Sequence, residues 1–408
     1  MHTKFSVLLA SLISILILIP VCAAQDDSDD FIRPNQSCTV FYAAHDDVVL
    51  GGNNEDWNNP LPQVWFVPAT ENEYGRIAFG FDNFFMQGGM NDQGLFFDGL
   101  ALDTRSEIDT DLPLYPGSLE DYALATCATV DCVVDLYHQY SRYYLASAQL
   151  LFGDATGASI IVEPTELVPT ADSFQVATNF LQSQSDPEKY TCSRYKTATT
   201  MLAEANTYSV ELFRDILDAT HAEGRNPTLY SNIYDLKNQI VYLYYYHDFE
   251  TVVTFDLAQE LAQGAHLYDL STLFPQNEAA KKWSERTSNT FQRRLEKAGY
   301  DPDIDPATFA AYVGTYEAPP ELGIATRYIY VVAYNKHLYV NTPGRLSRYL
   351  ILYPRSATEF FHMLYDQDRP LDIRFVLDDK GDVVEAVMTV DNIAYTLPRV
   401  DDARVTEE

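Results

Sequence analysis

Basic residues are scarce in this chain of 408 residues. It carries 27 lysines and arginines against 59 aspartates and glutamates, which gives a formal net charge of −32 at pH 7. Binding to nucleic acid or to an anionic membrane surface requires basic patches. The composition therefore argues against nucleic acid as a partner, and we interpret the widely spread acidic residues as a solvated surface.

Long apolar runs are also scarce. One run, Phe5–Ile19, follows a short polar start and leads into the small residues of Pro20–Ala24. This order is typical of a secretory signal peptide, so we expect a signal peptide at 1–24 and an acidic propeptide at 25–37. No later run approaches the ~20 apolar residues of a membrane span. We expect a secreted or periplasmic protein without a membrane span.

The chain has only five cysteines. Cys127 and Cys132 flank Ala128–Asp131, which we interpret as a turn between two helices. Disulfides persist in exported proteins, so a local disulfide is favoured over two free thiols. The spacing is neither C-x-x-C nor followed by a second pair, which argues against a metal. Cys38 and Cys192 would then stay unpaired.

Several common catalytic motifs are missing. The chain has no phosphate-binding loop, no dinucleotide-binding glycine triplet, no H-E-x-x-H and no G-x-S-x-G. Ser193–Lys196 matches the S-x-x-K of serine penicillin-recognising enzymes, but no convincing K-T-G follows it. We therefore expect no cofactor and disfavour a serine nucleophile.

The order of the elements indicates an α+β fold. A region of strands and turns is followed by helices and then by further strands, without the regular alternation of a doubly wound sheet. Strands are expected in 38–99 and at 149–152, 159–162, 240–246 and 252–255, and helices within 118–143 and at 194–206, 209–221 and 276–298.

A second unit follows a linker at 301–306. Short strands separated by turns in 307–403 predict a small antiparallel β-barrel. The stretch Tyr312–Glu317 resembles the opening of lipocalin-like domains that are appended to some secreted hydrolases. The expected domains are therefore 38–300 and 307–403.

Cys38 becomes the first residue of the chain if the preceding segment is removed. It would then carry a thiol with a pKa near ~8.5 and an α-amine with a pKa near ~8, so that one can act as base for the other. The alternative is an inert thiol on a buried strand, since free cysteine is among the most buried residue types.

Six sequence blocks occur in a specific order from Cys38 onward. They are Ser37–Thr39, Gly52–Trp57, Gln87–Leu95, Gly153–Glu163, Thr178–Phe180 and Ser193–Tyr195.

This series resembles the choloylglycine hydrolase family of N-terminal-nucleophile hydrolases, over roughly residues 38–275. The family of linear amide C–N hydrolases includes bile salt hydrolases, penicillin V acylases and, more distantly, acyl-CoA:6-aminopenicillanic acid acyltransferases. The resemblance implies an αββα four-layer sandwich and autocatalytic cleavage between Ser37 and Cys38. It makes Cys38 the nucleophile, Asp56 the group that orients its α-amine, and Asn179 an oxyanion donor. Arg194 would lower the thiol pKa and hold the site together.

Two positions depart from the family pattern. Asn53 stands where the family usually has arginine, three residues before Asp56, and we keep it as a less certain supporting residue. Ala101 stands where bile salt hydrolases have a second asparagine, which makes bile-salt specificity doubtful.

The function expected from the resemblance is hydrolysis of a small-molecule N-acyl amide by a cysteine nucleophile, without metal or cofactor. One alternative is an acyltransferase that passes the acyl group to an amine. Another is an inactive exported binding protein. The sequence leaves the oligomeric state open, including a homo-oligomer.

Overall fold

The computed structural model describes residues 38–102, 104–108, 111–185, 192–322, 324, 326–341, 349–365 and 371–400. The expected signal peptide, propeptide and Ser37 lie outside these ranges. Within them, no helix combines the length and apolar character needed to cross a membrane.

A six-stranded sheet contains the strand that follows Cys38. Its order is β10-β1-β2-β11-β12-β13, and all neighbours are antiparallel. Because side chains alternate along a strand, Val40 and Tyr42 of β1 face one side of the sheet and Phe41 faces the other. The bounds are β10 (Phe174–Ala177), β1 (Thr39–His45), β2 (Val48–Asp56), β11 (Thr228–Asp235), β12 (Ile240–Tyr245) and β13 (Asp248–Asp256).

An eight-stranded antiparallel sheet supplies the rest of the first region. Its order is β14-β3-β4-β5-β6-β7-β8-β9, so sequence neighbours are also neighbours in space from β3 to β9. The bounds are β14 (His266–Asp269), β3 (Pro62–Val67), β4 (Arg76–Phe81), β5 (Met86–Asn91), β6 (Phe96–Ala101), β7 (Ala148–Gly153), β8 (Ser159–Val162) and β9 (Leu167–Pro169).

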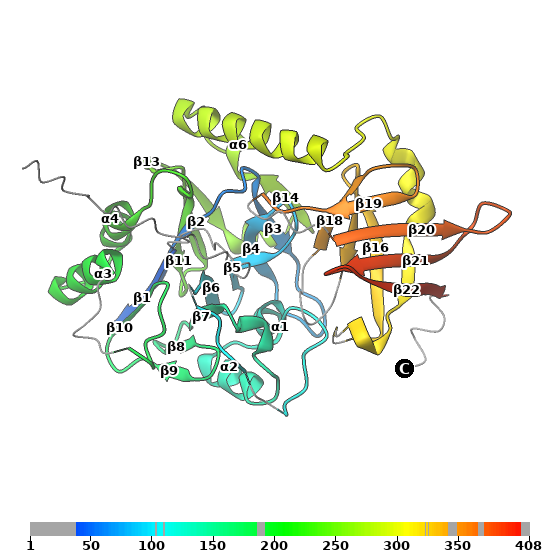
Figure 1. Ribbon diagram of the computed structural model, residues 1–408. Coiled ribbons are helices and arrows are strands. Elements are labelled where there is room, and N and C mark those ends of the chain that lie inside the picture. Colours follow the sequence, from blue (N-terminus) through cyan, green and yellow to red (C-terminus); the bar gives the residue numbers. More distant parts are fainter. Residues whose placement is uncertain are drawn as a thin grey trace, which may run out of the picture. The chain divides into compact units, whose positions relative to one another are not determined.

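Apolar clusters join the two sheets to each other and to the helices (Figure 1). Val40 and Tyr42 share a buried cluster with Phe79 and Phe96 of the eight-stranded sheet. Side chains on the opposite faces of the sheets pack against α3 and α4 in one case and against α1 and α2 in the other. The helices are α1 (Leu119–Thr126), α2 (Val130–Tyr137), α3 (Ser193–Glu204), α4 (Val210–Thr220), α5 (Leu257–Leu261) and α6 (Glu278–Lys297).

Three helices begin where the sequence offers capping residues. The side chains of Ser118, Thr129 and Ser209 accept hydrogen bonds from backbone N–H groups in the first turns of α1, α2 and α4. Such caps satisfy donors that have no partner within the helix. The helices predicted within 118–143 and at 194–206, 209–221 and 276–298 are confirmed to within a few residues.

The C-terminal strands close into a barrel, which confirms the expected barrel. Two of the barrel strands, β18 and β22, have an unusual composition. Each contains a proline, Pro354 or Pro398, and proline usually argues against a strand interior because it cannot donate to the ladder. The domain limits stay a prediction. The strands are β15 (Gly314–Glu317), β16 (Tyr328–Tyr334), β17 (His337–Asn341), β18 (Tyr349–Pro354), β19 (Glu359–His362), β20 (Leu371–Leu377), β21 (Val383–Val390) and β22 (Ile393–Val400).

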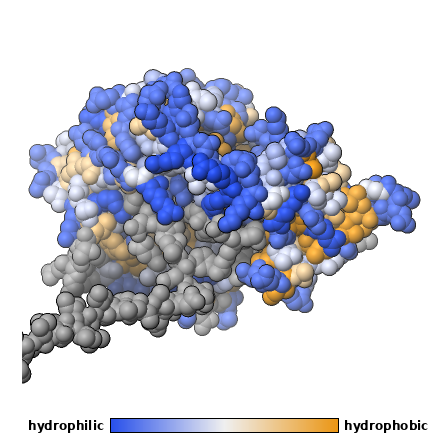
Figure 2. Space-filling model, turned by 45° about the horizontal axis from the view of Figure 1, so that its top comes forward, coloured by the Kyte–Doolittle hydropathy of each residue, from blue (hydrophilic) through white to orange (hydrophobic). Residues whose placement is uncertain are grey.

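The surface agrees with the interpretation of the acidic residues. Figure 2 shows a face that is largely hydrophilic, interrupted by smaller apolar patches. With a net charge of −32, such a surface favours solvation and repels other anions.

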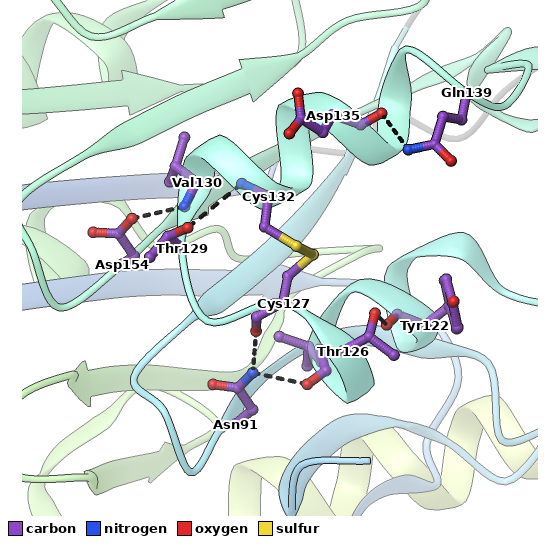
Figure 3. Close-up of a disulfide and its surroundings, with 11 residues drawn as sticks. Asn91, Tyr122, Thr126, Cys127, Thr129, Val130, Cys132, Asp135, Gln139 and Asp154 are labelled. Carbon is purple, nitrogen blue, oxygen red and sulfur yellow. Dashed lines mark hydrogen bonds between the residues drawn. A yellow bond between two sulfur atoms is a disulfide. The ribbon is translucent and has the colours of Figure 1, made fainter. Parts of the chain in front are cut away.

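A disulfide joins Cys127 to Cys132, the pairing favoured over two free thiols (Figure 3). It links the end of α1 to the first turn of α2. Asn91 Nδ2 donates to the carbonyl oxygens of Leu124 and Cys127, both at 2.7 Å, and so ties this turn to β5. Cys38 and Cys192 are free.

We expect the disulfide to stabilise the fold measurably. Replacing both Cys127 and Cys132 by serine removes a short cross-link and should lower the free energy of unfolding by about 2 kcal/mol. Guanidinium unfolding followed by circular dichroism measures this change. Cys192→Ser, which breaks no cross-link, is the control, and an unchanged midpoint in the double variant would contradict the expectation.

Candidate active site

Cys38 lies directly before β1 and its side chain is buried, with 4% exposed. In the registers of β1 with its neighbours, Thr39 pairs with Asn54 and Val40 pairs with Ala177. Continued by one or two residues, they bring Cys38 to the level of Glu55 on β2 and of Asn179 after β10. The thiol Sγ lies 3.9 Å from the backbone oxygen of Asp56. Cys38 therefore lies at the end of an interior strand, between two segments that carry polar residues.

Arg194, in the first turn of α3, connects the predicted site residues. Its Nη1 donates to the backbone oxygen of Cys38 at 2.5 Å and to Thr39 Oγ1 at 3.0 Å. Its Nη2 donates to Asn179 Oδ1 at 3.0 Å. Hydrogen bonds from a guanidinium are charge-assisted and fixed in direction by its planar geometry. One side chain thus fixes the strand start and the nearby amide together.

Asn179 is held from its other end as well. Its Nδ2 donates to the backbone oxygen of Ala101 at 2.8 Å, and an amide nitrogen carries a second hydrogen. The buried side chain of Gln149 donates to the carbonyl oxygens of Thr178 at 2.5 Å and Phe180 at 3.0 Å, on either side of Asn179. Ala101 has no polar side chain, but its backbone oxygen holds the amide of Asn179.

Asp56 ends β2 and is fully buried. Thr228 Oγ1 donates to Asp56 Oδ1, and the same hydroxyl accepts from the backbone N–H of Ala222 at 2.8 Å. The register of β2 and β11 pairs these two residues directly. The carboxyl group is therefore fixed at the same end of the sheet as Cys38.

The thiol of Cys38 has a raised pKa. Burial is the main cause, the negative charges of Glu55, Asp56 and Asp98 add to it, and the hydrogen bond to the Asp56 backbone opposes it. That Arg194 lowers this pKa stays a prediction. Its guanidinium binds the Cys38 carbonyl and Thr39, and Thr39 lies on the opposite face of β1 from the Cys38 side chain.

Two buried acids near the thiol were missed by sequence analysis. Burial raises the pKa of Glu55 to about 8, and the charge of Asp56 adds to the shift. Burial, followed by the charge of Glu55, also raises the pKa of Asp98 on β6. Strand alternation could have found Glu55, because it faces the same side of β2 as Asn53.

Asn53 supplies no charge to this environment. Among the residues that the structure describes, neither polar atom of its side chain has a hydrogen-bond partner, and the same is true of Glu55 Oε2 and Asp98 Oδ2. Asn53 pairs across the sheet with Asn232, and Glu55 pairs with Tyr230. The departure from arginine thus leaves the thiol beside neutral and acidic side chains.

A surface hollow lies at the other end of β1. His45, Phe174, Leu202 and Tyr208 are among the residues that line it, and none of the predicted site residues does. We therefore place the candidate active site at Cys38 and not at this hollow.

Comparisons with known proteins gave structural likeness only. No protein-family model and no curated protein matches the chain. A mutant of the conjugated bile acid hydrolase from Clostridium perfringens is similar over 59% of this chain and 99% of its own, with 16% identity and a TM-score of 0.46. Another variant of that hydrolase has 17% identity, the same coverage and a TM-score of 0.46.

A third similar structure is the penicillin V acylase from Agrobacterium tumefaciens. It has 16% identity and a TM-score of 0.42, and the match covers 57% of this chain and 91% of the acylase. The site described above is therefore argued from its own contacts.

The buried Glu55 carboxyl predicts a specific dependence of stability on pH. Its pKa is about 8 in the fold and roughly 4.3 in an unfolded chain. The contribution of protonated Glu55 to the free energy of unfolding is complete below about pH 4 and is lost as the pH rises through about 8. We expect the melting temperature of Glu55→Gln to fall less than that of the wild type between about pH 5 and 8.5.

Differential scanning calorimetry across this range measures the effect. Glu204→Gln, at an exposed position on α3, should follow the wild-type curve. If the melting temperature of Glu55→Gln changes with pH in parallel with that of the wild type, the raised pKa of Glu55 is contradicted.

Proposed function

We propose that the protein is a cysteine-nucleophile amidohydrolase that cleaves linear N-acyl amides. The observation that carries the proposal is the hydrogen-bonding of Arg194, which joins the backbone of Cys38 to the side chain of Asn179. A structural thiol on a strand needs no such arrangement. An acyl-transfer site needs a fixed nucleophile beside a fixed donor for the developing oxyanion.

The fold is compatible with this proposal. Two antiparallel sheets share a buried cluster, and helices pack on their other faces. We infer that this region is an αββα sandwich of the N-terminal-nucleophile type, with a lipocalin-like barrel appended. The proposal includes export through the signal peptide and autocatalytic cleavage before Cys38.

The proposed reaction proceeds by acylation and deacylation. The α-amine of Cys38, oriented by Asp56, takes the thiol proton while Sγ bonds to the amide carbonyl carbon. Asn179 Nδ2, through its remaining hydrogen, and backbone N–H groups stabilise the oxyanion. The C–N bond breaks, and the amine product leaves with the proton. Water then attacks the thioester and releases the acid.

Cys38→Ala should abolish hydrolysis across a panel of N-acyl amides. Mass spectrometry should show that the active wild-type chain begins at Cys38, since only a free α-amine can accept the proton. Cys192→Ala, which removes the other free thiol, is the matched control and should keep full activity. A wild-type chain that is fully active while still carrying Ser37 would overturn the mechanism.

Asn179→Ala should lower kcat by about 10²–10³-fold with a small effect on KM, as expected for loss of an oxyanion donor. Arg194→Lys should also lower kcat, because an ammonium group cannot reproduce the planar contacts to Cys38 and Asn179. Steady-state kinetics tests both, with exposed Asn72→Ala as control. Unchanged kcat in Asn179→Ala would exclude Asn179 as a donor.

A further inference from the structure

Two histidines and a glutamate meet away from the Cys38 thiol. His221 and Glu223 lie in the loop between α4 and β11, and His247 lies in the turn between β12 and β13. One potential ligand atom from each residue lies within 4.8 Å of the others. The two imidazole rings are stacked, with centroids 4.8 Å apart. The three residues come from two segments separated in sequence, so no short motif could reveal them.

The rings are oriented in a way that suits a metal ion. His221 Nδ1 hydrogen-bonds to the backbone oxygen of Asp218 at 2.5 Å. Such a bond fixes the tautomer and leaves Nε2 with a free lone pair, as is usual for metal-ligating histidines. His221 Nε2 lies 3.5 Å from a carboxylate oxygen of Glu223. His221 therefore presents a ligand atom towards Glu223.

His247 presents a second unused ligand atom. Its Nε2 is buried and has no hydrogen-bond partner within the described part of the chain. A buried polar atom without a partner is costly. The backbone of His247 has a positive φ of 62°, as does that of Tyr246 with 48°, which is the geometry of a two-residue hairpin turn.

We propose that His221, Glu223 and His247 bind a divalent transition-metal ion of the zinc type. Imidazole nitrogen and carboxylate oxygen are common zinc ligands. Zinc ligands at about 2.0–2.1 Å from the ion lie roughly 3.4 Å apart in a tetrahedron, so the present cluster must contract slightly. The Glu223 side chain is 78% exposed and can move to do so. Three protein ligands leave a fourth position for water.

The ion would brace the loop next to the candidate active site. It would join the α4–β11 loop to the β12–β13 turn. The backbone N–H of Ala222, next to His221, donates to Thr228, whose hydroxyl donates to Asp56. The proposed site is distinct from the Cys38 thiol, and we expect its main effect to be on the position of this loop.

Isothermal titration of the untagged, chelator-treated mature chain with zinc chloride tests the proposal. We expect one zinc ion per chain and a higher melting temperature with zinc. His221→Ala and His247→Asn should each weaken binding by about tenfold or more. Asparagine is chosen at 247 because it tolerates a positive φ. His45→Ala, which removes an exposed histidine elsewhere, should bind zinc as the wild type does.

If a histidine variant fails to fold, Glu223→Gln tests whether zinc binds at these three residues, because this exposed side chain is not needed for the core. It should weaken zinc binding, whereas Glu204→Gln should not. The proposal is overturned if the wild type binds no zinc. It is also overturned if folded variants at 221, 223 and 247 all bind zinc like the wild type, which would place the ion on a thiol or on surface acids.

Discussion

The contact between Arg194 and the Cys38 carbonyl is the interaction on which the candidate site depends. A residue at the start of a strand is the one most easily frayed, and Cys38 lies there with a buried side chain. The guanidinium fixes it by binding the carbonyl oxygen and the neighbouring Thr39 hydroxyl. Because the same planar guanidinium binds Asn179, it links the backbone of Cys38 directly to the side-chain amide of Asn179.

Much of this arrangement could be predicted from the sequence, since it depends on local patterns. A capped helix such as α4 and a strand with a short apolar run such as β7 were predicted to within a few residues. Other features depend on contacts between distant segments. Asn179 binds a backbone oxygen of Ala101, and a backbone group leaves no signal in the residue type. Asp98 and Glu55 influence each other's charge although they lie in different sheets, and no pattern within either strand can reveal how the sheets pack.

Buried acids beside the nucleophile carry a cost that the rest of the fold must offset. Glu55, Asp56 and Asp98 are all almost fully buried, and a buried charge without a partner is strongly unfavourable. Protonation reduces the cost, in agreement with the raised pKa of Glu55 and Asp98. The aromatic cluster between the sheets, including Phe79, Phe96 and Tyr230, supplies the apolar burial that keeps these groups in place.

The same environment constrains how the thiol can react. Burial raises the pKa of the Cys38 thiol above its ordinary value, which disfavours a preformed thiolate. In the proposed mechanism the proton must therefore leave during attack, and its nearest acceptor is the residue's own α-amine. An amide nitrogen cannot accept that proton, so a chain still joined to Ser37 has no base for its nucleophile. In the proposed mechanism, amide hydrolysis therefore requires cleavage before Cys38, because only the cleaved chain has a free α-amine to take the thiol proton.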